Sequence, residues 1–556
     1  MPTPVEMSQL IALFNAGQYA EMESQSRLLL ERYSDSGFIW KVLGTALLVQ
    51  GKEALPALSK ATELLPNDAQ AHNNLGNALR DIGQIDDAIA SYNRALEIKP
   101  DFAEAHGNLG IALKETGQLD KAVSSYRRAL KIKPDFAMTR DNLGSALKDL
   151  GQFDDAINNH RRALEIQPDF AEAHNNLGIA LKETGQLDKA VSSYRRALEI
   201  KSDFTVAHLN LGLALQDIGQ IDDAMASYRR ALEVQPGFAE AHLNLGLCLL
   251  EIGQYSEAWT EYEYRWEGAN PKLPPRPAIP LPQWTGQQPS SDDRLLVLEE
   301  QGMGDRLQFA RYLPLAADCF ARKVSCVIGM PLQALFQRSF PDVEILDAVP
   351  TDLSPWQWQC PLLSLPLAFG TTLETIPKPV PYLLPDPVRA AFWQARIAGL
   401  NLPLSTRKIG VVWKAGKAMK NAPLRSLELQ QLAPLLNVPG CAWFSLQKEP
   451  DPEKAAWVAS GKLIDWADAF GDFDDTAALA VNLDLVISVD TSVAHLAGGL
   501  GLPVWLFNRH ASEWRWMRHR DDSPWYPTMR LFTQKTAGEW DEVVKCMAAE
   551  LMGAPQ

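Results

Sequence analysis

A repeat of 34 residues dominates the first half of the chain. The dipeptide Leu-Gly recurs with its glycine at residues 76, 110, 144, 178, 212 and 246. Apolar residues at helical spacing follow each glycine, and in most copies a proline then ends the second helix. One such helix pair cannot bury its apolar face alone, so a sustained period predicts pairs that pack on their neighbours in a solenoid.

The pattern resembles the tetratricopeptide repeat. After Gly76 come Ala88, Tyr92, Ala95 and Pro100. Small residues of this kind let two helices approach closely, and the aromatic residue fills the space between them. We expect a tetratricopeptide superhelix over residues 1–270, with about eight repeats of which the first two are degenerate. The concave groove of such arrays usually holds a peptide or protein, so a protein partner is expected.

One asparagine precedes the Leu-Gly pair in each regular repeat. The six are Asn74, Asn108, Asn142, Asn176, Asn210 and Asn244. Amides can donate to and accept from an extended peptide backbone without reading its sequence. The array of the O-linked N-acetylglucosamine transferase is similar, with an asparagine ladder that binds acceptor protein. The ladder therefore predicts an acceptor-peptide groove; local hydrogen bonding within a repeat consensus is the alternative.

Composition excludes several classes of protein. There are 53 basic and 68 acidic residues, a net charge of −15, which argues against general nucleic-acid binding. The six cysteines show no zinc spacing and are interpreted as reduced thiols. The N-terminus lacks the pattern of a signal peptide, and no apolar stretch is long enough to span a membrane. We expect a cytoplasmic protein.

The second half has a different period. A proline-rich linker is expected at 271–293. From residue 294, short apolar runs alternate with segments of helical spacing, beginning with RLLVLEE, VSCVIGM and VEILDA. A second series begins with KIGVVW, AWFSLQ and DLVISV. The fold class is therefore α + α/β, with α/β units at 294–400 and 401–556 and a cleft at the carboxyl ends of their strands.

The motifs of this half resemble those of the heptosyltransferases, glycosyltransferase family 9, whose fold is the GT-B pair of Rossmann-type units. The matching segments include EEQGMGDRLQFARY (299–312), GVVWKAG (410–416), FSLQKE (444–449) and the region 472–505. The whole chain resembles bacterial proteins that fuse tetratricopeptide repeats to such a domain. The first unit is short for this fold, so the repeats could complete the acceptor side.

Asp305 is the candidate base. Inverting sugar transfer needs a carboxylate to take the proton of the acceptor hydroxyl. The resemblance implies this role for Asp305, because the aspartate of the matching Gly-Asp is the proposed base of heptosyltransferases, and it places Gly304 in the nucleotide-sugar site. A helix N-cap is the alternative for Asp305, and Glu299 or Glu300 could serve as the base instead.

Asp490, Thr491 and Ser492 connect an expected strand to an expected helix. The unpaired N–H groups and the dipole of a helix N-terminus favour phosphate oxygens. The resemblance implies that this segment and His495 bind the diphosphate of a nucleotide sugar. An N-cap beside a buried histidine is the alternative.

Three further residues are candidates for nucleotide-sugar binding. A leaving nucleoside diphosphate needs positive charge, which Lys414 and Arg425 could supply. Glu449 could bind a ribose hydroxyl. Solvated loop charge is the alternative for the cations. We expect no metal site and no cofactor, because no Asp-x-Asp motif with an apolar strand beside it is present and the helix and lysine could neutralise the leaving group.

These features predict an inverting, metal-independent glycosyltransferase of the hexosyl or N-acetylhexosaminyl type. Its donor would be a nucleotide-diphosphate sugar. Its acceptor would be a protein hydroxyl recruited by the repeats. The alternatives are a non-catalytic scaffold with a degenerate transferase fold, and a transferase that acts on a glycan.

Overall fold

The computed structural model describes residues 2–268, 276, 278–300, 302–416, 422–448 and 451–553. Within them the chain divides into two compact units, Met1–Ile218 and Gly219–Gln556. The first unit is entirely helical. The second contains the last repeat helices and both sheets.

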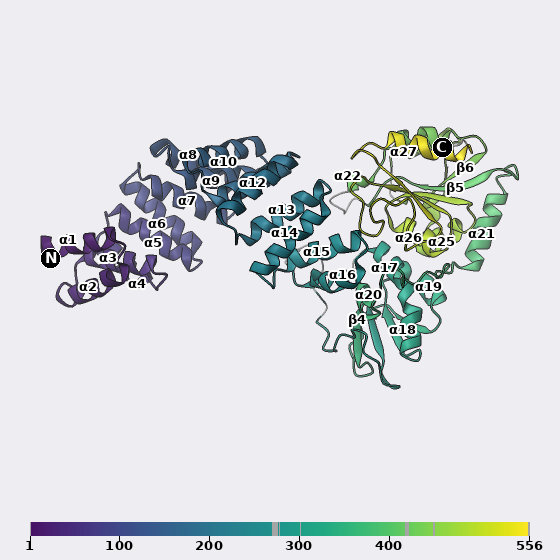
Figure 1. The fold of residues 1–556 in the computed structure, drawn as a ribbon, viewed down its shortest axis with the longest axis horizontal. Coiled ribbons are helices and arrows are strands. Elements are labelled where there is room, and N and C mark those ends of the chain that lie inside the picture. The colour runs from purple at the N-terminus through teal and green to yellow at the C-terminus, as the bar shows by residue number, and fades with distance from the viewer. Residues whose placement is uncertain are drawn as a thin grey trace. The chain divides into compact units, whose positions relative to one another are not determined.

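The first unit is a series of antiparallel helix pairs (Figure 1). Its helices are α1 (Pro4–Asn15), α2 (Tyr19–Arg32), α3 (Gly37–Val49), α4 (Leu55–Leu64), α5 (Ala69–Asp81), α6 (Ile85–Ile98), α7 (Ala103–Glu115), α8 (Leu119–Ile132), α9 (Ala137–Asp149), α10 (Phe153–Ile166), α11 (Ala171–Glu183), α12 (Leu187–Ile200) and α13 (Thr205–Asp217).

The Leu-Gly glycine allows close packing within each pair. A Cβ on Gly76 would lie 2.5 Å from Cε1 of Tyr92, which is fully buried. The pair α9–α10 departs from this pattern, because His160 replaces the tyrosine and its Nδ1 lies 2.7 Å from Oδ1 of the buried Asp141. The predicted helical solenoid is confirmed.

The second unit begins with α14 (Ile221–Val234), α15 (Ala239–Glu251), α16 (Tyr255–Tyr262) and the 3-10 turn η1 (Glu263–Trp266). Its strands are β1 (Leu295–Leu298), β2 (Val324–Val327), β3 (Val343–Leu346), β4 (Trp358–Pro361), β5 (Arg407–Val412), β6 (Cys441–Ser445), β7 (Ile464–Asp465), β8 (Leu485–Val489), β9 (Val504–Asn508) and β10 (Met529–Thr533).

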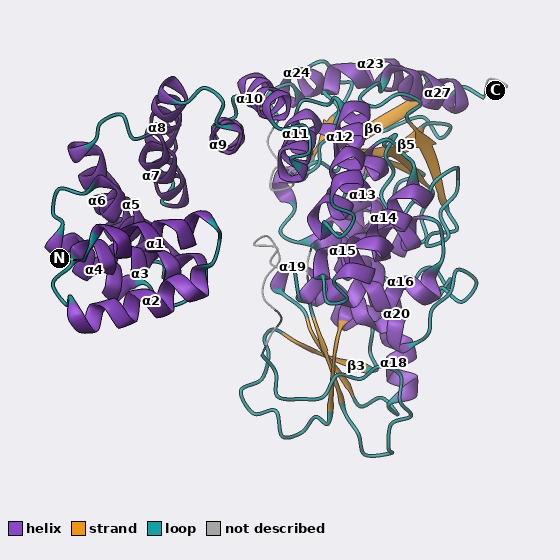
Figure 2. Ribbon diagram, turned by 60° about the vertical axis from the view of Figure 1, so that its left-hand side comes forward, coloured by secondary structure: helices purple, strands orange, loops and turns teal. Residues whose placement is uncertain are grey.

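The remaining helices of this unit cover the sheets. They are α17 (Met303–Phe309), α18 (Leu313–Cys319), α19 (Met330–Ser339), α20 (Leu365–Ala368), α21 (Pro387–Ala398), α22 (Ala422–Arg425), α23 (Ala433–Leu436), α24 (Lys454–Ala459), α25 (Phe473–Ala480), α26 (Ser492–Gly499) and α27 (Asp541–Leu551). Figure 2 shows the strands gathered in separate groups.

Both sheets are parallel. The first has the order β3-β2-β1-β4 and the second the order β10-β9-β8-β5-β6-β7. Leu295 of β1 pairs with Val324 of β2, and Ile409 of β5 pairs with Leu485 of β8. Strands β1 and β8 are buried along their whole length, as expected for parallel strands covered on both faces. The predicted α/β architecture is confirmed.

The last repeat helices are joined tightly to the first sheet. Nε1 of Trp259 on α16 donates to the carbonyl of Thr371 over 2.9 Å, and Figure 2 shows α16 beside α20. The guanidinium of Arg265 in η1 donates to both carboxylate oxygens of Glu300, each over 3.0 Å. Both residues of this ion pair are buried, so the joint is rigid.

The first part of the expected linker at 271–293 lies outside the described residues, apart from residue 276. Its later part packs on the first sheet. Trp284 is buried, and its backbone N–H donates to the carbonyl of Gln359 over 2.8 Å.

Among the described helices, none is long and apolar enough to cross a bilayer.

Candidate functional site

A cavity of about 1090 Å³ lies in the second unit. Its lining comes from the loop and helix after β1, from the loops after β5, β6 and β8, and from α15 and α25. In open parallel sheets a crevice forms where the strand order reverses. The order reverses between β1 and β4 in the first sheet and between β5 and β8 in the second. The cavity therefore lies where ligands of such sheets bind.

Asp305 lines this cavity. It is the third residue of α17, whose N-cap position is occupied by Gly302, so the N-cap alternative is wrong. Oδ1 of Asp305 accepts a hydrogen bond from the guanidinium of Arg515. Oδ2 makes no hydrogen bond with another residue of the described chain, so it is available to a ligand.

The two alternative bases are engaged elsewhere. Glu300 is buried against Arg265, and burial raises the pKa of its carboxyl. Oε2 of Glu299 accepts from the N–H of Gly329 over 2.8 Å and pairs with Arg306. Neither glutamate is among the described residues that line the cavity. The geometry favours Asp305.

Arg515 positions Asp305 from a separate part of the chain. Its Nε donates to Oε1 of the buried Gln308 over 2.9 Å, and its remaining nitrogens pair with Asp305 and Glu513. The guanidinium also lies 4.3 Å from the ring centre of Trp514. Although burial opposes it, the neighbouring carboxylates raise the pKa of Arg515, which stays charged.

The N-terminus of α26 faces the same cavity through Thr491, Ser492 and Val493. No side chain of the described residues caps this helix. Thr491 occupies the N-cap position, but its hydroxyl lies 3.1 Å from that of Ser488 instead of bonding to the helix. An uncapped N-terminus leaves N–H groups that can donate to an anion.

His495 lies inside the site on α26. Its Nδ1 is 2.9 Å from the hydroxyl of Tyr526, and its ring is stacked on Trp516. Burial, followed by the charge of Arg515, lowers the pKa of His495 to about 3. The imidazole is therefore neutral near pH 7. If the Tyr526 hydroxyl donates to Nδ1, Nε2 carries the hydrogen and can donate to a ligand.

Gly304 allows α17 to approach α26. A Cβ at this position would lie 2.8 Å from Cδ2 of His495 and 3.7 Å from Cα of Ser492. The glycine thus lets the residue that precedes Asp305 contact the segment that follows Asp490. The structure brings together these residues, which are about 190 positions apart in sequence.

The two cations predicted from the sequence, Lys414 and Arg425, are paired with carboxylates. Nη1 of Arg425 donates to Oδ2 of Asp490 over 2.7 Å. Nζ of Lys414 lies 2.9 Å from Glu428 and 3.1 Å from Asp451. Although burial opposes it, these hydrogen bonds raise the pKa of the Lys414 ammonium. Both cations line the cavity. Glu449 lies outside the described residues.

The asparagine ladder is partly occupied by internal hydrogen bonds. The amides of Asn108, Asn176 and Asn210 donate to Asn73, Asp141 and Asn175, each 35 residues earlier, over 2.9–3.0 Å. Asn74 donates to Thr45, and Asn244 donates to the carbonyl of Glu240. For Asn142, the residue 35 positions earlier is Gly107, which has no side chain. Local hydrogen bonding, the stated alternative, is therefore present; peptide binding by the ladder stays a prediction.

Several lining residues were not predicted from the sequence. They include Leu243, Leu247 and Lys448. Lys448 belongs to the FSLQKE segment and could have been found from it. Trp514 and Arg515 belong to a tryptophan-rich segment whose sequence allows two interpretations, packing and contact with the nucleotide, and the structure places both residues in the cavity lining. Nothing in the local pattern indicates that Arg515 has a partner 210 residues earlier.

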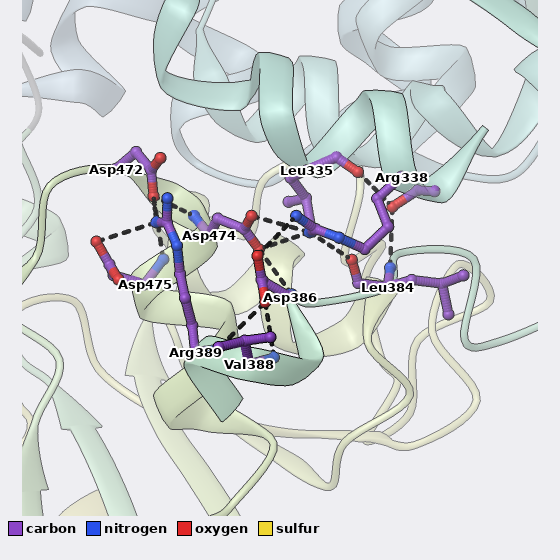
Figure 3. Close-up of polar contacts among 10 residues, drawn as sticks. Leu335, Arg338, Leu384, Asp386, Val388, Arg389, Asp472, Asp474 and Asp475 are labelled. Atoms are coloured by element: carbon purple, nitrogen blue, oxygen red, sulfur yellow. Dashed lines mark hydrogen bonds and ion pairs between the residues drawn. The ribbon is translucent and has the colours of Figure 1, made fainter. Parts of the chain in front are cut away.

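A group of ion pairs joins α19, α21 and α25 next to the cavity (Figure 3). Arg338 of α19 lies 2.8 Å from the buried Asp474 of α25 and 3.3 Å from Asp386, the N-cap of α21. Arg389 of α21 pairs with Asp472 and Asp475 (Figure 3). Asp472 lines the cavity, so these contacts hold one edge of the site.

Comparison with known proteins identifies the repeats. The family model described as TPR repeat matches residues 76–117 and 144–185. Models described as tetratricopeptide repeat match 57–90, 103–136, 171–204 and 209–274. Among curated proteins, the chain is similar to protein FlbA of Caulobacter vibrioides, with 30% identity over 304 residues. The match covers 50% of this chain and 49% of FlbA, so the chain spans about half the length of that relative.

Solved structures are similar to parts of the chain. YrrB, described as a TPR protein with an unusual peptide-binding site, is 26% identical over 33% of this chain and 95% of its own, with a TM-score of 0.29. MamA of Desulfovibrio magneticus RS-1 is 20% identical over 31% of this chain and 96% of its own, also with a TM-score of 0.29. The family matches establish that the helix pairs within residues 57–274 are tetratricopeptide repeats.

Proposed function

We propose that the protein is an inverting, metal-independent glycosyltransferase that moves a sugar from a nucleotide-diphosphate donor to a protein hydroxyl. One observation carries the proposal: Asp305 and the uncapped N-terminus of α26 line the same cavity, at the strand-order reversals of two parallel sheets. Two such units with a cleft between them resemble the GT-B arrangement of the heptosyltransferases. The repeats, which commonly bind peptides, support a protein acceptor.

The reaction would be an in-line displacement. Oδ2 of Asp305 would take the proton of the acceptor hydroxyl while its oxygen attacks the anomeric carbon. The bond from that carbon to the diphosphate would break on the opposite face, so the configuration would invert. N–H groups of α26, with Arg425 and Lys414, would stabilise the negative charge of the leaving diphosphate.

Replacing Asp305 tests this role. Asp305→Asn keeps the size of the side chain but removes the base, so transfer should fall by about 10²–10⁴-fold. A panel of nucleotide sugars, screened by protection against heat, identifies the donor, and nucleotide release measures turnover. Nucleotide binding should persist in the variant, because Asp305 is not among the proposed phosphate ligands.

Asp318→Asn is the matched control. Asp318 is exposed on α18 and does not line the cavity, so this variant should behave as the wild type. Turnover by Asp305→Asn equal to that of the control would remove Asp305 from the mechanism. If no nucleotide sugar protects the wild type or is consumed, the scaffold alternative replaces the transferase. Transfer to glycans but not to peptides would support the glycan alternative.

A further inference from the structure

One wall of the cavity belongs to the repeat array. Leu243 and Leu247 of α15 line the cavity together with Asp305, and both leucines are partly exposed. Residues four positions apart lie on the same face of a helix, so these side chains form one apolar strip. We call this strip the α15 wall.

Some earlier repeats carry polar or small residues at these positions, and the others carry apolar ones, namely Leu209 at the position of Leu243 and Ile111, Ile179 and Leu213 at that of Leu247. The position of Leu243 holds Asn73, Gly107, Asp141 and Asn175 in four earlier repeats, and that of Leu247 holds Asn77 and Ser145 in two of them. Several of these polar residues accept the hydrogen bonds of the asparagine ladder. Leucine is thus not required for the repeat to fold, and what distinguishes Leu243 and Leu247 from the apolar residues of the earlier repeats is that they line the cavity.

The α15 wall is held rigidly relative to Asp305. A Cβ on Gly246 would lie 3.0 Å from the backbone nitrogen of Tyr262, so α15 packs closely on the end of α16. The 3-10 turn η1, which follows α16, carries Arg265. The buried hydrogen bonds of Arg265 to Glu300 join η1 to the segment between β1 and α17. Because Asp305 belongs to α17, the apolar strip and the base share one framework, as a specificity site requires.

We infer that the α15 wall binds the acceptor, and that the acceptor is a polypeptide with an apolar side chain beside its reactive hydroxyl residue. This inference rests on the proposed function and names its substrate class. Covering partly exposed leucines with an apolar side chain removes apolar surface from water. A glycan would place hydroxyl groups against the same strip. The strip is continuous with the cavity that contains Asp305, so a bound hydroxyl residue would bring its neighbours to it.

Short peptides with a central serine test the inference. In one set leucine occupies each flanking position in turn, and in a matched set asparagine replaces it. Binding of fluorescein-labelled peptides is followed by anisotropy, which requires no donor, and transfer is followed by mass spectrometry with the donor found above. The wild type should favour at least one leucine-flanked peptide by about tenfold over its asparagine counterpart.

Two variants, Leu243→Asn and Leu247→Ser, introduce residues that earlier repeats carry at the same positions. Each should remove most of the leucine preference while nucleotide binding and thermal unfolding stay as in the wild type. The control is Leu209→Asn on α13, the same substitution at the same repeat position outside the cavity lining, which should keep the preference.

The outcomes separate the inference from the proposed function. Equal binding of the two peptide sets by the wild type, or an unchanged preference in both variants, would overturn the role of the α15 wall even if transfer occurs. A leucine preference that the variants lose would support the wall even if no sugar is transferred, and the absence of transfer would then count against the transferase alone.

Discussion

Gly304 lies where α17 packs against α26. A Cβ there would lie 2.8 Å from the ring of His495, which Tyr526 and Trp516 hold in place. We therefore expect Gly304→Ala to destabilise the second unit by about 1–3 kcal/mol. Urea unfolding followed by tryptophan fluorescence reports on this unit, because only Trp40 of the 16 tryptophans precedes Trp259.

Gly302→Ala is the control for that prediction. A Cβ on Gly302 would lie 3.8 Å from Oδ2 of Asp305, and the φ of −79° at this position suits any residue. The change in the free energy of unfolding should stay within about 0.5 kcal/mol. Equal effects of the two substitutions would show that contact with His495 is not what requires glycine at 304.

His495 makes stability depend on pH. Burial lowers its folded-state pKa from 6.5 to about 3, so the unfolded state binds the proton first as the pH falls. The contribution of the neutral His495 to the free energy of unfolding is fully present above about pH 6.5. Below that pH it falls by about 1.4 kcal/mol per pH unit. Urea unfolding at several values between about pH 5 and 7 should give a smaller slope for His495→Gln than for the wild type. Parallel slopes would contradict a buried neutral histidine.

At the scale of elements, α19 is held to α25 by a partly buried ion pair. Arg338→Gln would leave the buried carboxylate of Asp474 without its cation, which should cost about 1–3 kcal/mol of unfolding free energy. Arg322→Gln, which breaks an exposed pair with Asp342, should cost less than about 0.5 kcal/mol. Urea unfolding compares the two, and equal losses would contradict the role of Arg338 in joining the elements.

The elements differ in how well the sequence predicts them. The 34-residue period predicts the helix pairs, because the two helices of a pair are adjacent in the sequence. Long apolar runs such as β1 and β8 were also predicted. The edge strands β4 and β10 were not: β4 contains Pro361 and a glutamine, and each strand has a full strand neighbour on one side and an isolated bridge on the other, Gln283 to Gln359 for β4 and Asp522 to Arg530 for β10.

At the scale of the whole molecule, the last repeat helices and the two sheets, all within the second unit, contribute to the site. The sequence predicts that Asp305 and Asp490 follow strands, and the parallel fold explains why such residues share one edge. It does not predict that Arg515 binds Asp305 or that α15 lines the cavity. Those contacts depend on how separately predicted elements pack, and the local pattern around Arg515 does not indicate a partner 210 residues away.

The most direct test of the account is a crystal structure of the full chain with the nucleoside diphosphate, chosen among UDP, GDP, ADP and CDP, that best protects it against heat. The account predicts the diphosphate at the start of α26, with oxygens accepting from the N–H groups of Ser492 and Val493 and from Arg425, and with Asp305 facing the end where the sugar would be attached. A nucleotide bound outside this cavity, or a diphosphate turned away from α26, would contradict it.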